Sequence, residues 1–457
     1  MDTIARLYEV YLRSHVVTTD SRAIKPGCIF FAFKGETFDG NAFAQQALEQ
    51  GAALCVVSDA NCAKDPRCVL VSDVLETLQQ LAKCHRDHLT IPVVGVTGTN
   101  GKTTTKELVN AVLSKRYRTT ATQGNFNNHL GVPLTLLSIP EDAEIAIVEM
   151  GANHPGEIAA LCEIARPDFG LITNVGKAHL EGFGSFEGVI RTKTELYRHL
   201  AAVSGTIFVN SDNKILTEQA ARLATIPQEE SLIPAYAPGA PLAAPRKDQL
   251  GVVTYGQAEE SDVKGSYVSA DPYMKFYFEE GDNVYTVQSQ LLGGYNFDNA
   301  MAAVAVGMFF GVERFEIKEA IEQYVPSNKR SQFKRTGKNG LLLDCYNANP
   351  SSMGVAIRNF DALTADHKVV MLGGMKELGE DSEAEHRNIV ELLKGCDMEM
   401  KVLVGPEFAF AAKEQGFAWF ADVHAAQDYL KGHPVVGATI LLKGSNSTKM
   451  WLLEEVL

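Results

Sequence analysis

A glycine-rich segment with one lysine and several threonines carries the clearest chemistry in the chain. It spans Thr97–Thr105 and reads TGTNGKTTT. An apolar strand pattern ending at Val96 precedes it, and a helical pattern with leucine and valine on one side follows it. Glycines let backbone N–H groups wrap a phosphate, and a helix N-terminus adds partial positive charge. Lys102 can neutralise phosphate oxygens, and the Thr103 hydroxyl can bind Mg²⁺.

This segment therefore predicts a nucleotide phosphate site. The predicted contacts are Gly98, Thr99, Asn100, Gly101, Lys102, Thr103 and Thr104. The spacing departs from the pattern GxxxxGKS/T, because the first glycine of that pattern would fall on Val96. The alternative is a glycine-rich turn that only opens a helix. Gly-Lys-Thr and both flanking patterns favour the phosphate site.

A carboxylate and a histidine follow two other strand patterns. Glu149 ends the apolar run Ile145–Val148, and His179 follows the run Phe169–Thr173. The carboxyl end of a strand beside a phosphate loop is where such folds hold a metal ligand. Each signal is weak alone, since many strands end in Glu and most loop histidines are surface residues. Lys193, taken by itself, reads as a solvated charge on a helix.

Strand and helix patterns alternate along the chain, which predicts an α/β protein. A domain commonly holds roughly 100–200 residues, and the patterns fall into three such groups. The predicted boundaries are 1–89, 90–325 and 326–457. The first domain is a small α/β unit with strand patterns at Cys28–Phe33 and Ala53–Val57. A long amphipathic helix is predicted over Val74–His88.

The central domain alternates strands and helices in the manner of a parallel sheet covered on both faces. Its strands include Ile145–Val148, Phe169–Thr173 and Thr206–Asn210. Three further runs alternate like antiparallel strands appended to that sheet: Val252–Tyr255, Met274–Phe278 and Val284–Gln288. The Ala- and Pro-rich stretch Glu229–Ala244 predicts a surface excursion.

The third domain restarts the alternation after a boundary near Pro326–Arg330. Its predicted strands are Leu341–Asp344, Lys368–Leu372, Lys401–Val404 and Thr439–Leu442. Helical patterns lie between them, which is typical of a doubly wound, Rossmann-like domain.

The composition restricts the classes of function. The chain has 457 residues with 42 basic and 56 acidic side chains, for a net charge of -14. A surface that neutralises nucleic acid or anionic lipid usually has the opposite balance, so we expect neither partner. No run approaches the ~18 apolar residues of a membrane span, and the first residues lack a secretory pattern. The eight cysteines form no CxxC pair, which is typical of reduced thiols in a cytoplasmic protein.

These motifs together resemble the Mur ligases, the ATP-dependent amide ligases of peptidoglycan synthesis. The resemblance rests on Thr97–Thr105, Glu149–Gly151, Asn174–His179 with Lys193, and Gly294–Ala300. It covers all three domains and is most specific in the central one. It implies a UDP-sugar domain, a P-loop ATPase domain and a Rossmann-like domain that binds the incoming dipeptide.

Three more segments are similar to the family type that adds D-alanyl-D-alanine to UDP-N-acetylmuramoyl-tripeptide. They are Gly124–Pro133, Tyr346–Pro350, and Asp20–Arg22 with Lys34–Gly40. The implied contacts are Ser21, Arg22, Lys34 and Thr37 for the sugar nucleotide; Asn125, Asn127 and Asn128 on the acceptor side; Asp344, Asn347 and Asn349 for the dipeptide and ATP; and Asn296, Asn299 and Arg330 for the nucleotide. By chemistry alone, Asn and Asp clusters at turns are more often backbone caps than ligands.

The resemblance also implies a reaction. The peptide carboxylate attacks the γ-phosphate of ATP, giving an acyl phosphate and ADP, and the dipeptide amine then displaces phosphate. Two Mg²⁺ ions are implied, one on Thr103 and Glu149 and one on His179 and a carbamylated Lys193. Nearby cations favour the neutral amine that reacts with CO₂. We expect a cytoplasmic monomer.

Two alternatives stay open at this point. A sister ligase that adds a single amino acid to a sugar-peptide, or glutamate to folate, would carry the same phosphate loop. A P-loop protein that hydrolyses ATP to switch conformation would carry it as well. These differ in whether phosphate release requires both a UDP-sugar peptide and an amine.

Overall fold

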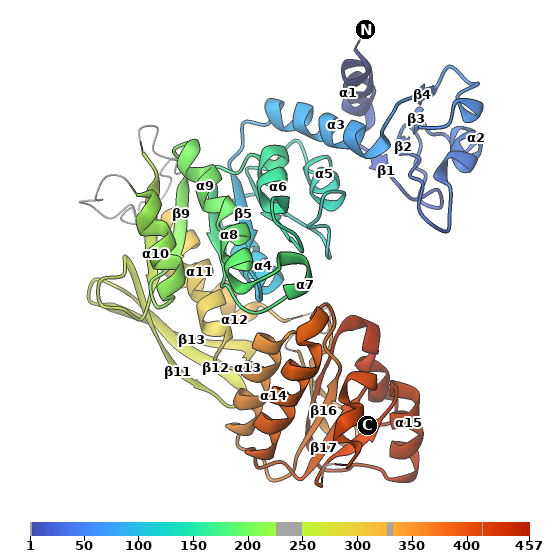
Figure 1. Ribbon diagram of the computed structural model, residues 1–457. Helices are drawn as coiled ribbons and strands as arrows, with labels where there is room; N and C mark the ends of the chain where they lie inside the picture. The colour runs from blue at the N-terminus through green and yellow to red at the C-terminus, as the bar shows by residue number, and fades with distance from the viewer. Residues whose placement is uncertain (1, 225–248, 327–331, 414) are drawn as a thin grey trace.

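The computed structural model describes residues 2–224, 249–326, 332–413 and 415–457. They form three α/β units in chain order, each built on its own sheet (Figure 1). The N-terminal and C-terminal units lie at opposite ends of the molecule, with the central unit between them. The expected excursion Glu229–Ala244 and the predicted nucleotide contact Arg330 lie outside the described residues.

The N-terminal unit holds a small parallel sheet of four short strands in the order β1-β2-β3-β4. The strands are β1 (Val17–Thr18), β2 (Ile29–Phe31), β3 (Leu54–Val57) and β4 (Cys68–Leu70), and the helices are α1 (Thr3–Ser14), α2 (Ala44–Glu49) and α3 (Val74–His88). The helix α3 has the predicted bounds. Asp73 starts it, because its side chain accepts a hydrogen bond from the N–H of Glu76 at 3.0 Å.

The central unit is a nine-stranded sheet in the order β13-β12-β11-β10-β9-β8-β5-β7-β6. Its strands are β5 (Val93–Thr97), β6 (Thr119–Ala121), β7 (Ile145–Glu149), β8 (Phe169–Ile172), β9 (Thr206–Asn210), β10 (Gly251–Gly256), β11 (Val263–Ala270), β12 (Tyr273–Glu280) and β13 (Asn283–Leu292). Its helices are α4 (Lys102–Leu113), α5 (Gly131–Leu136), α6 (Glu157–Ala165), α7 (Leu180–Phe183), α8 (Phe186–Lys193), α9 (Glu195–Ala202), α10 (Lys214–Leu223), α11 (Asn296–Phe309) and α12 (Arg314–Gln323). Separate apolar cores on the two faces confirm the double cover.

The prediction that Val252–Tyr255 is antiparallel is wrong. This segment lies in β10, which runs parallel to β9 with Val252 opposite Ile207. Antiparallel pairing begins only between β11 and β12 and continues between β12 and β13. Alternating burial reports that one face of a strand is less covered than the other, and it carries no information on strand direction.

The C-terminal unit is a six-stranded sheet in the order β14-β15-β19-β16-β17-β18. Its strands are β14 (Gln332–Arg335), β15 (Gly340–Asp344), β16 (Lys368–Gly373), β17 (Met400–Val404), β18 (Ala418–Phe420) and β19 (Thr439–Lys443), and its helices are α13 (Pro350–Asp361), α14 (Ser382–Lys394) and α15 (Val423–Gly432). Apolar side chains of α13 and α14 cover one face and those of α15 the other. The unit is doubly wound, with only β14 antiparallel.

The first two units share one apolar core. Leu78 of α3 belongs to the same buried cluster as Leu136 of α5. Arg86, near the end of α3, fixes the junction: its guanidinium donates to the carbonyl of Ala165 at 2.9 Å and pairs with Asp168 at 3.0 Å. Shared burial and a buried, fully engaged cation favour a fixed relation between these units.

Within the described parts of the chain, no helix is both long and apolar enough to cross a membrane. All eight cysteines are free thiols.

Candidate active site

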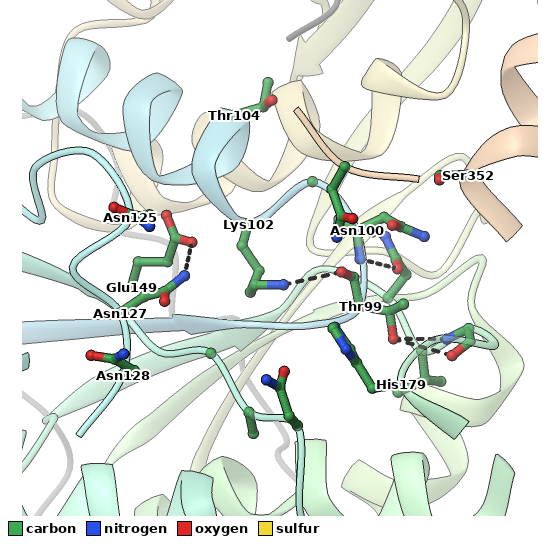
Figure 2. Close-up of a pocket in the computed structure, with 18 of the residues that line it drawn as sticks. Thr99, Asn100, Lys102, Thr104, Asn125, Asn127, Asn128, Glu149, His179 and Ser352 are labelled. Carbon is green, nitrogen blue, oxygen red and sulfur yellow. Dashed lines mark hydrogen bonds between the residues drawn. The ribbon is translucent and has the colours of Figure 1, made fainter. Parts of the chain in front are cut away.

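A cavity of about 740 Å³ opens at the carboxyl ends of the central strands and reaches the C-terminal unit. The carboxyl ends of parallel strands meet at one edge of a sheet, where turns and helix N-termini supply ligands. Most of the predicted site residues line this cavity (Figure 2): Thr99, Asn100, Gly101, Lys102, Thr104, Asn125, Asn127, Asn128, Glu149, His179, Asn296, Asn299, Asp344 and Asn347.

The phosphate loop between β5 and α4 needs glycine at two positions. Gly98 has φ 141° and Gly101 has φ 80°. A Cβ atom on Gly98 would collide with the hydroxyl of Thr173, and one on Gly101 with the side chain of Asn299. The loop is therefore pressed against the end of β8 and the start of α11. Its helix begins at Lys102, so the unpaired N–H groups of the first turn are available to an anion.

The segment after β8 holds the phosphate loop in shape. The N–H of Asn100 donates to the side chain of Asn174 at 3.0 Å, and the Asn174 amide donates back to the Asn100 carbonyl at 3.0 Å. The Nζ of Lys102 donates to the carbonyl of Gly98 at 2.9 Å and to that of Thr99 at 3.0 Å. Figure 2 shows Lys102 reaching toward Thr99. The ammonium group thus lies within the curve of the loop, placed to neutralise phosphate oxygens.

Glu149 ends β7 beside the loop and is almost fully buried. Its Oε1 accepts from the amide of Asn127 at 2.7 Å, while its Oε2 is buried without a hydrogen-bond partner. The Thr103 hydroxyl, on the adjoining α4, is likewise buried without one. Two free buried oxygens suit Mg²⁺, which takes a few protein oxygens and completes its shell with water and phosphate. These residues fit the metal that the resemblance implies.

His179 lines the cavity directly before α7, on the same edge as the phosphate loop. Burial lowers its pKa against the opposing pull of Glu377, which favours the neutral imidazole that binds metals. Its Nδ1 contacts the carboxylate of Glu377, a residue of the C-terminal unit.

Lys193 ends α8 and does not line the cavity itself. It is 2% exposed, and its Nζ donates to the carbonyl of Ala152 at 3.2 Å. The alternative of a solvated helix charge is therefore wrong. Burial lowers the pKa of Lys193 well below its ordinary value, and Lys102 adds to the effect through like charge. The helical periodicity of the sequence does not show which other elements bury this amine.

Asn296 and Asn299 open α11 and are both buried. Asn299 accepts from the Thr105 hydroxyl at 3.0 Å and donates to Asn296 at 2.8 Å. Asn296 donates in turn to the carbonyl of Leu292 at 2.8 Å. This chain of hydrogen bonds ties α11 to α4, so the two asparagines shape the cavity wall as well as face it.

The C-terminal unit contributes Asp344 and Asn347, which follow β15. Lys443 at the end of β19 pairs with Asp344 at 2.5 Å and donates to the carbonyl of Asn347 at 3.3 Å. Asn349, by contrast, does not line the cavity. It caps α13 in a capping box, and its amide donates to the side chain of Asn100 at 2.8 Å. We therefore assign it first to helix capping and domain docking.

The four sugar-nucleotide candidates Ser21, Arg22, Lys34 and Thr37 lie in the N-terminal unit and line no part of the cavity. Arg22 is exposed and pairs with Asp20 at 2.8 Å, and Lys34 pairs with Asp39 at 3.7 Å. Gly98, Thr103 and Lys193 also lie outside its lining, behind residues that form it.

Several lining residues escaped sequence reasoning. They include Gln79 and Lys83 of α3, Tyr295 and Asp298 at the start of α11, and Tyr346 and Lys443 of the C-terminal unit. Lys443, at a strand end before Gly444-Ser445, carried a usable signal. Gln79 and Lys83 carried none, because they read as the polar face of an amphipathic helix.

Comparison with known proteins agrees with this arrangement. The family models described as "Mur ligase family, catalytic domain", "Mur ligase middle domain" and "Mur ligase, glutamate ligase domain" match residues 13–94, 96–233 and 329–446. The chain is 32% identical over 455 residues to the UDP-N-acetylmuramoyl-tripeptide–D-alanyl-D-alanine ligase of Bacillus subtilis, covering 97% of this chain and 92% of the relative. It is 33% identical over 440 residues to the same-named ligase of Escherichia coli, covering 95% and 91%.

A solved structure described as MurF ligase from Thermotoga maritima in complex with ADP matches with a TM-score of 0.81 at 26% identity, covering 100% of this chain and 98% of that one. The match thus extends over all three units. With relatives above 30% identity along almost its whole length and three family domains in order, the chain belongs to the Mur ligase family.

Proposed function

We propose that this chain joins D-alanyl-D-alanine to UDP-N-acetylmuramoyl-tripeptide in an ATP-dependent reaction of peptidoglycan precursor synthesis. The observation that carries the proposal is the composite cavity. A phosphate loop, a carboxylate at a strand end and polar groups of the C-terminal unit face one space. The relatives that span nearly the whole chain carry the name of that ligase.

The residues divide the work by position. The loop and Lys102 bind and neutralise the phosphates of ATP while the peptide carboxylate attacks the γ-phosphate. A carboxylate is a poor acyl donor, so phosphorylation supplies the leaving group. The amine of the dipeptide, held by Asp344 and Asn347, then attacks the acyl carbon and phosphate leaves. Closure of the C-terminal unit on the central one would exclude water, which would otherwise hydrolyse the acyl phosphate.

The UDP moiety would bind in the N-terminal unit, at Ser21, Arg22, Lys34 and Thr37. These residues lie away from the cavity, which suits a long substrate. A tripeptide alone extends roughly 10 Å at ~3.3–3.6 Å per residue, and the sugar and diphosphate add to that. Gln79 and Lys83 of α3 line the cavity on the side of the N-terminal unit and would flank the passage. Because UDP-sugars and ATP are made inside the cell, we place the reaction in the cytoplasm.

The metal sites belong to the same proposal. Thr103 and Glu149 would hold one Mg²⁺, and His179 and a carbamylated Lys193 a second. Bound Mg²⁺ supplies charge neutralisation for phosphoryl transfer. The buried, neutral amine of Lys193 is the form that adds CO₂, and the resulting carbamate offers two hard oxygens. Intact-mass measurement under CO₂, compared with Lys193→Arg, tests the modification directly.

The test of function is a substrate panel. Purified protein receives ATP, Mg²⁺, UDP-muramoyl peptides of different length and amines that include D-alanyl-D-alanine and single amino acids. We expect phosphate release only with a UDP-tripeptide and the dipeptide together. Release with a single amino acid would assign a sister ligase, and release without either substrate would assign an ATP-driven switch; both outcomes overturn the proposal.

A further inference from the structure

Two residues with left-handed backbone meet across the boundary between the central and C-terminal units. His179 has φ 50° directly before α7, and Glu377 has φ 62° in the turn between β16 and the short helix Gly379–Asp381. The Nδ1 of His179 contacts the carboxylate of Glu377. Residues other than glycine rarely adopt this backbone, and it persists where the surrounding structure holds a side chain in a required direction.

The turn that carries Glu377 is braced on both sides. Within its own unit, the Nε2 of His386 accepts from the N–H of Met375 at 3.0 Å. Toward the central unit, a Cβ atom on Gly379 would lie 3.3 Å from the Cβ of Glu181, so the turn packs against α7. Glu377 is therefore a carboxylate on a stiff support, although its side chain is 57% exposed.

The two ring nitrogens of His179 then have different surroundings. Nδ1 meets Glu377, which does not line the cavity, whereas the histidine itself does. A histidine that binds a metal commonly donates its other ring N–H to a carboxylate, which fixes the tautomer and the ring orientation and raises its basicity as a ligand. The carboxylate of Glu377 contacts Nδ1 and can serve as that outer carboxylate, which leaves Nε2 as the acceptor.

We propose that Glu377 is a positioning residue that holds the Nδ1–H tautomer of His179, so that the second Mg²⁺ site is complete only when the C-terminal unit is docked. The proposal rests on the proposed function through the metal role of His179. In this proposal, the charge of the phosphates is fully neutralised only after the C-terminal unit docks. Phosphoryl transfer would therefore be slow until the site is closed.

Docking alone does not require Glu377, because other contacts cross the same boundary. Lys177 pairs with Glu385 of α14 at 2.9 Å, and the N–H of Lys177 donates to the hydroxyl of Ser351 at 3.0 Å. Glu385 is thus a matched control: a carboxylate of the same unit, paired across the same boundary, whose partner is no predicted metal ligand.

The experiment compares Glu377→Gln with Glu385→Gln in the full chain. Mn²⁺ replaces Mg²⁺ as the probe, and free Mn²⁺ is followed by electron paramagnetic resonance with a non-hydrolysable ATP analogue and the UDP-tripeptide bound. We expect the dissociation constant of the weaker of the two Mn²⁺ sites to rise about 10–100-fold in Glu377→Gln and to stay unchanged in Glu385→Gln. In wild type, ¹⁵N spectra of the His179 ring, assigned with His179→Asn, should show Nδ1–H, and Glu377→Gln should lose that preference.

The outcomes are separable from those of the substrate panel, since the Mn²⁺ titration needs no ligation. If both variants leave Mn²⁺ binding unchanged, or shift it equally, Glu377 is only a docking contact and the proposal is overturned. In turnover, Glu377→Gln should lower kcat and raise the Mg²⁺ needed for half activity while leaving the KM for the UDP-tripeptide unchanged. A changed KM with unchanged Mg²⁺ dependence contradicts the proposal.

Discussion

Replacing Lys193 by methionine should separate stability from activity. The lysine is 2% exposed, and its Nζ donates one hydrogen bond, to the carbonyl of Ala152 at 3.2 Å. Methionine has a similar length and no polar atom to bury. Burying a polar group without full hydrogen bonding costs about 1–3 kcal/mol, and an apolar side chain of similar volume avoids that cost. We therefore expect Lys193→Met to raise the free energy of unfolding in CO₂-free buffer.

This gain in the free energy of unfolding should depend on pH, in a direction set by the pKa of Lys193. Burial holds the pKa of Lys193 well below the 10.5 of an unfolded lysine. Between those two pKa values the unfolded chain carries a proton that the folded chain does not, so the stability of the wild type rises with pH. The slope approaches about 1.4 kcal/mol per pH unit for one proton. The advantage of Lys193→Met should accordingly be larger at pH 7 than at pH 9.

The assay is urea unfolding at both pH values, followed by hydrogen exchange of α8, with ligase turnover measured in parallel. Lys264→Met, at a partly exposed lysine of β11 paired with Glu259, is the control and should change stability by less than about 0.5 kcal/mol. Bicarbonate should reduce the difference in free energy of unfolding between Lys193→Met and the wild type, because a carbamate that forms only on the folded wild-type chain stabilises it. Turnover of Lys193→Met should fall at least about 100-fold. Three results would refute the reasoning: a Lys193→Met protein that is less stable than the wild type, a stability difference between the two that does not change with pH, or a Lys193→Met protein with normal turnover.

Three other outcomes follow from the structure. Lys102→Ala should lower turnover by about 100–1,000-fold with no change in Tm, because Nζ donates to two carbonyls of the phosphate loop at the surface of the cavity and belongs to no apolar core in the described part of the chain. Near-normal turnover would remove this loop as the ATP site. Among the described residues, the apolar cores of the C-terminal unit are separate from those of the central unit, and polar contacts such as Asn349–Asn100 at 2.8 Å connect the two units. X-ray scattering should therefore show the C-terminal unit moving as a body when an ATP analogue and the UDP-tripeptide bind, and superimposable curves would contradict this. His85, between the hydroxyls of Tyr8 and Tyr11, has its pKa lowered to about 4 by burial, so the N-terminal unit should lose about 2 kcal/mol between pH 7 and pH 5 as the unfolded chain takes up a proton that the folded one refuses. Hydrogen exchange of α1 and α3, corrected for intrinsic rates, measures that loss, and an equal loss in His85→Gln would show that another group is responsible.

Features that depend on neighbours along the chain could be predicted from the amino-acid sequence. The phosphate loop is one example, because a strand, glycines at positive φ and a helix N-terminus are consecutive in the chain. Glu149 is another, since a strand and its terminal residue are one segment. The helix Val74–His88 was predicted to the residue, because its cap and its apolar stripe are local. The order of strands and helices likewise indicated three α/β units, of which the central and C-terminal ones have sheets covered on both faces.

Features that depend on residues distant in the chain became visible only in the three-dimensional structure. The direction of β10 is set by its ladder with β9, and alternating burial looks the same in either direction. Asn349 caps a helix, although the resemblance to the Mur ligases implied a ligand. Gln79 and Lys83 reach the cavity because α3 shares a core with the central unit. His179 contacts Glu377, and Lys193 is buried from solvent, because elements distant in the sequence pack together. The separation of two elements in the sequence does not give their distance in space.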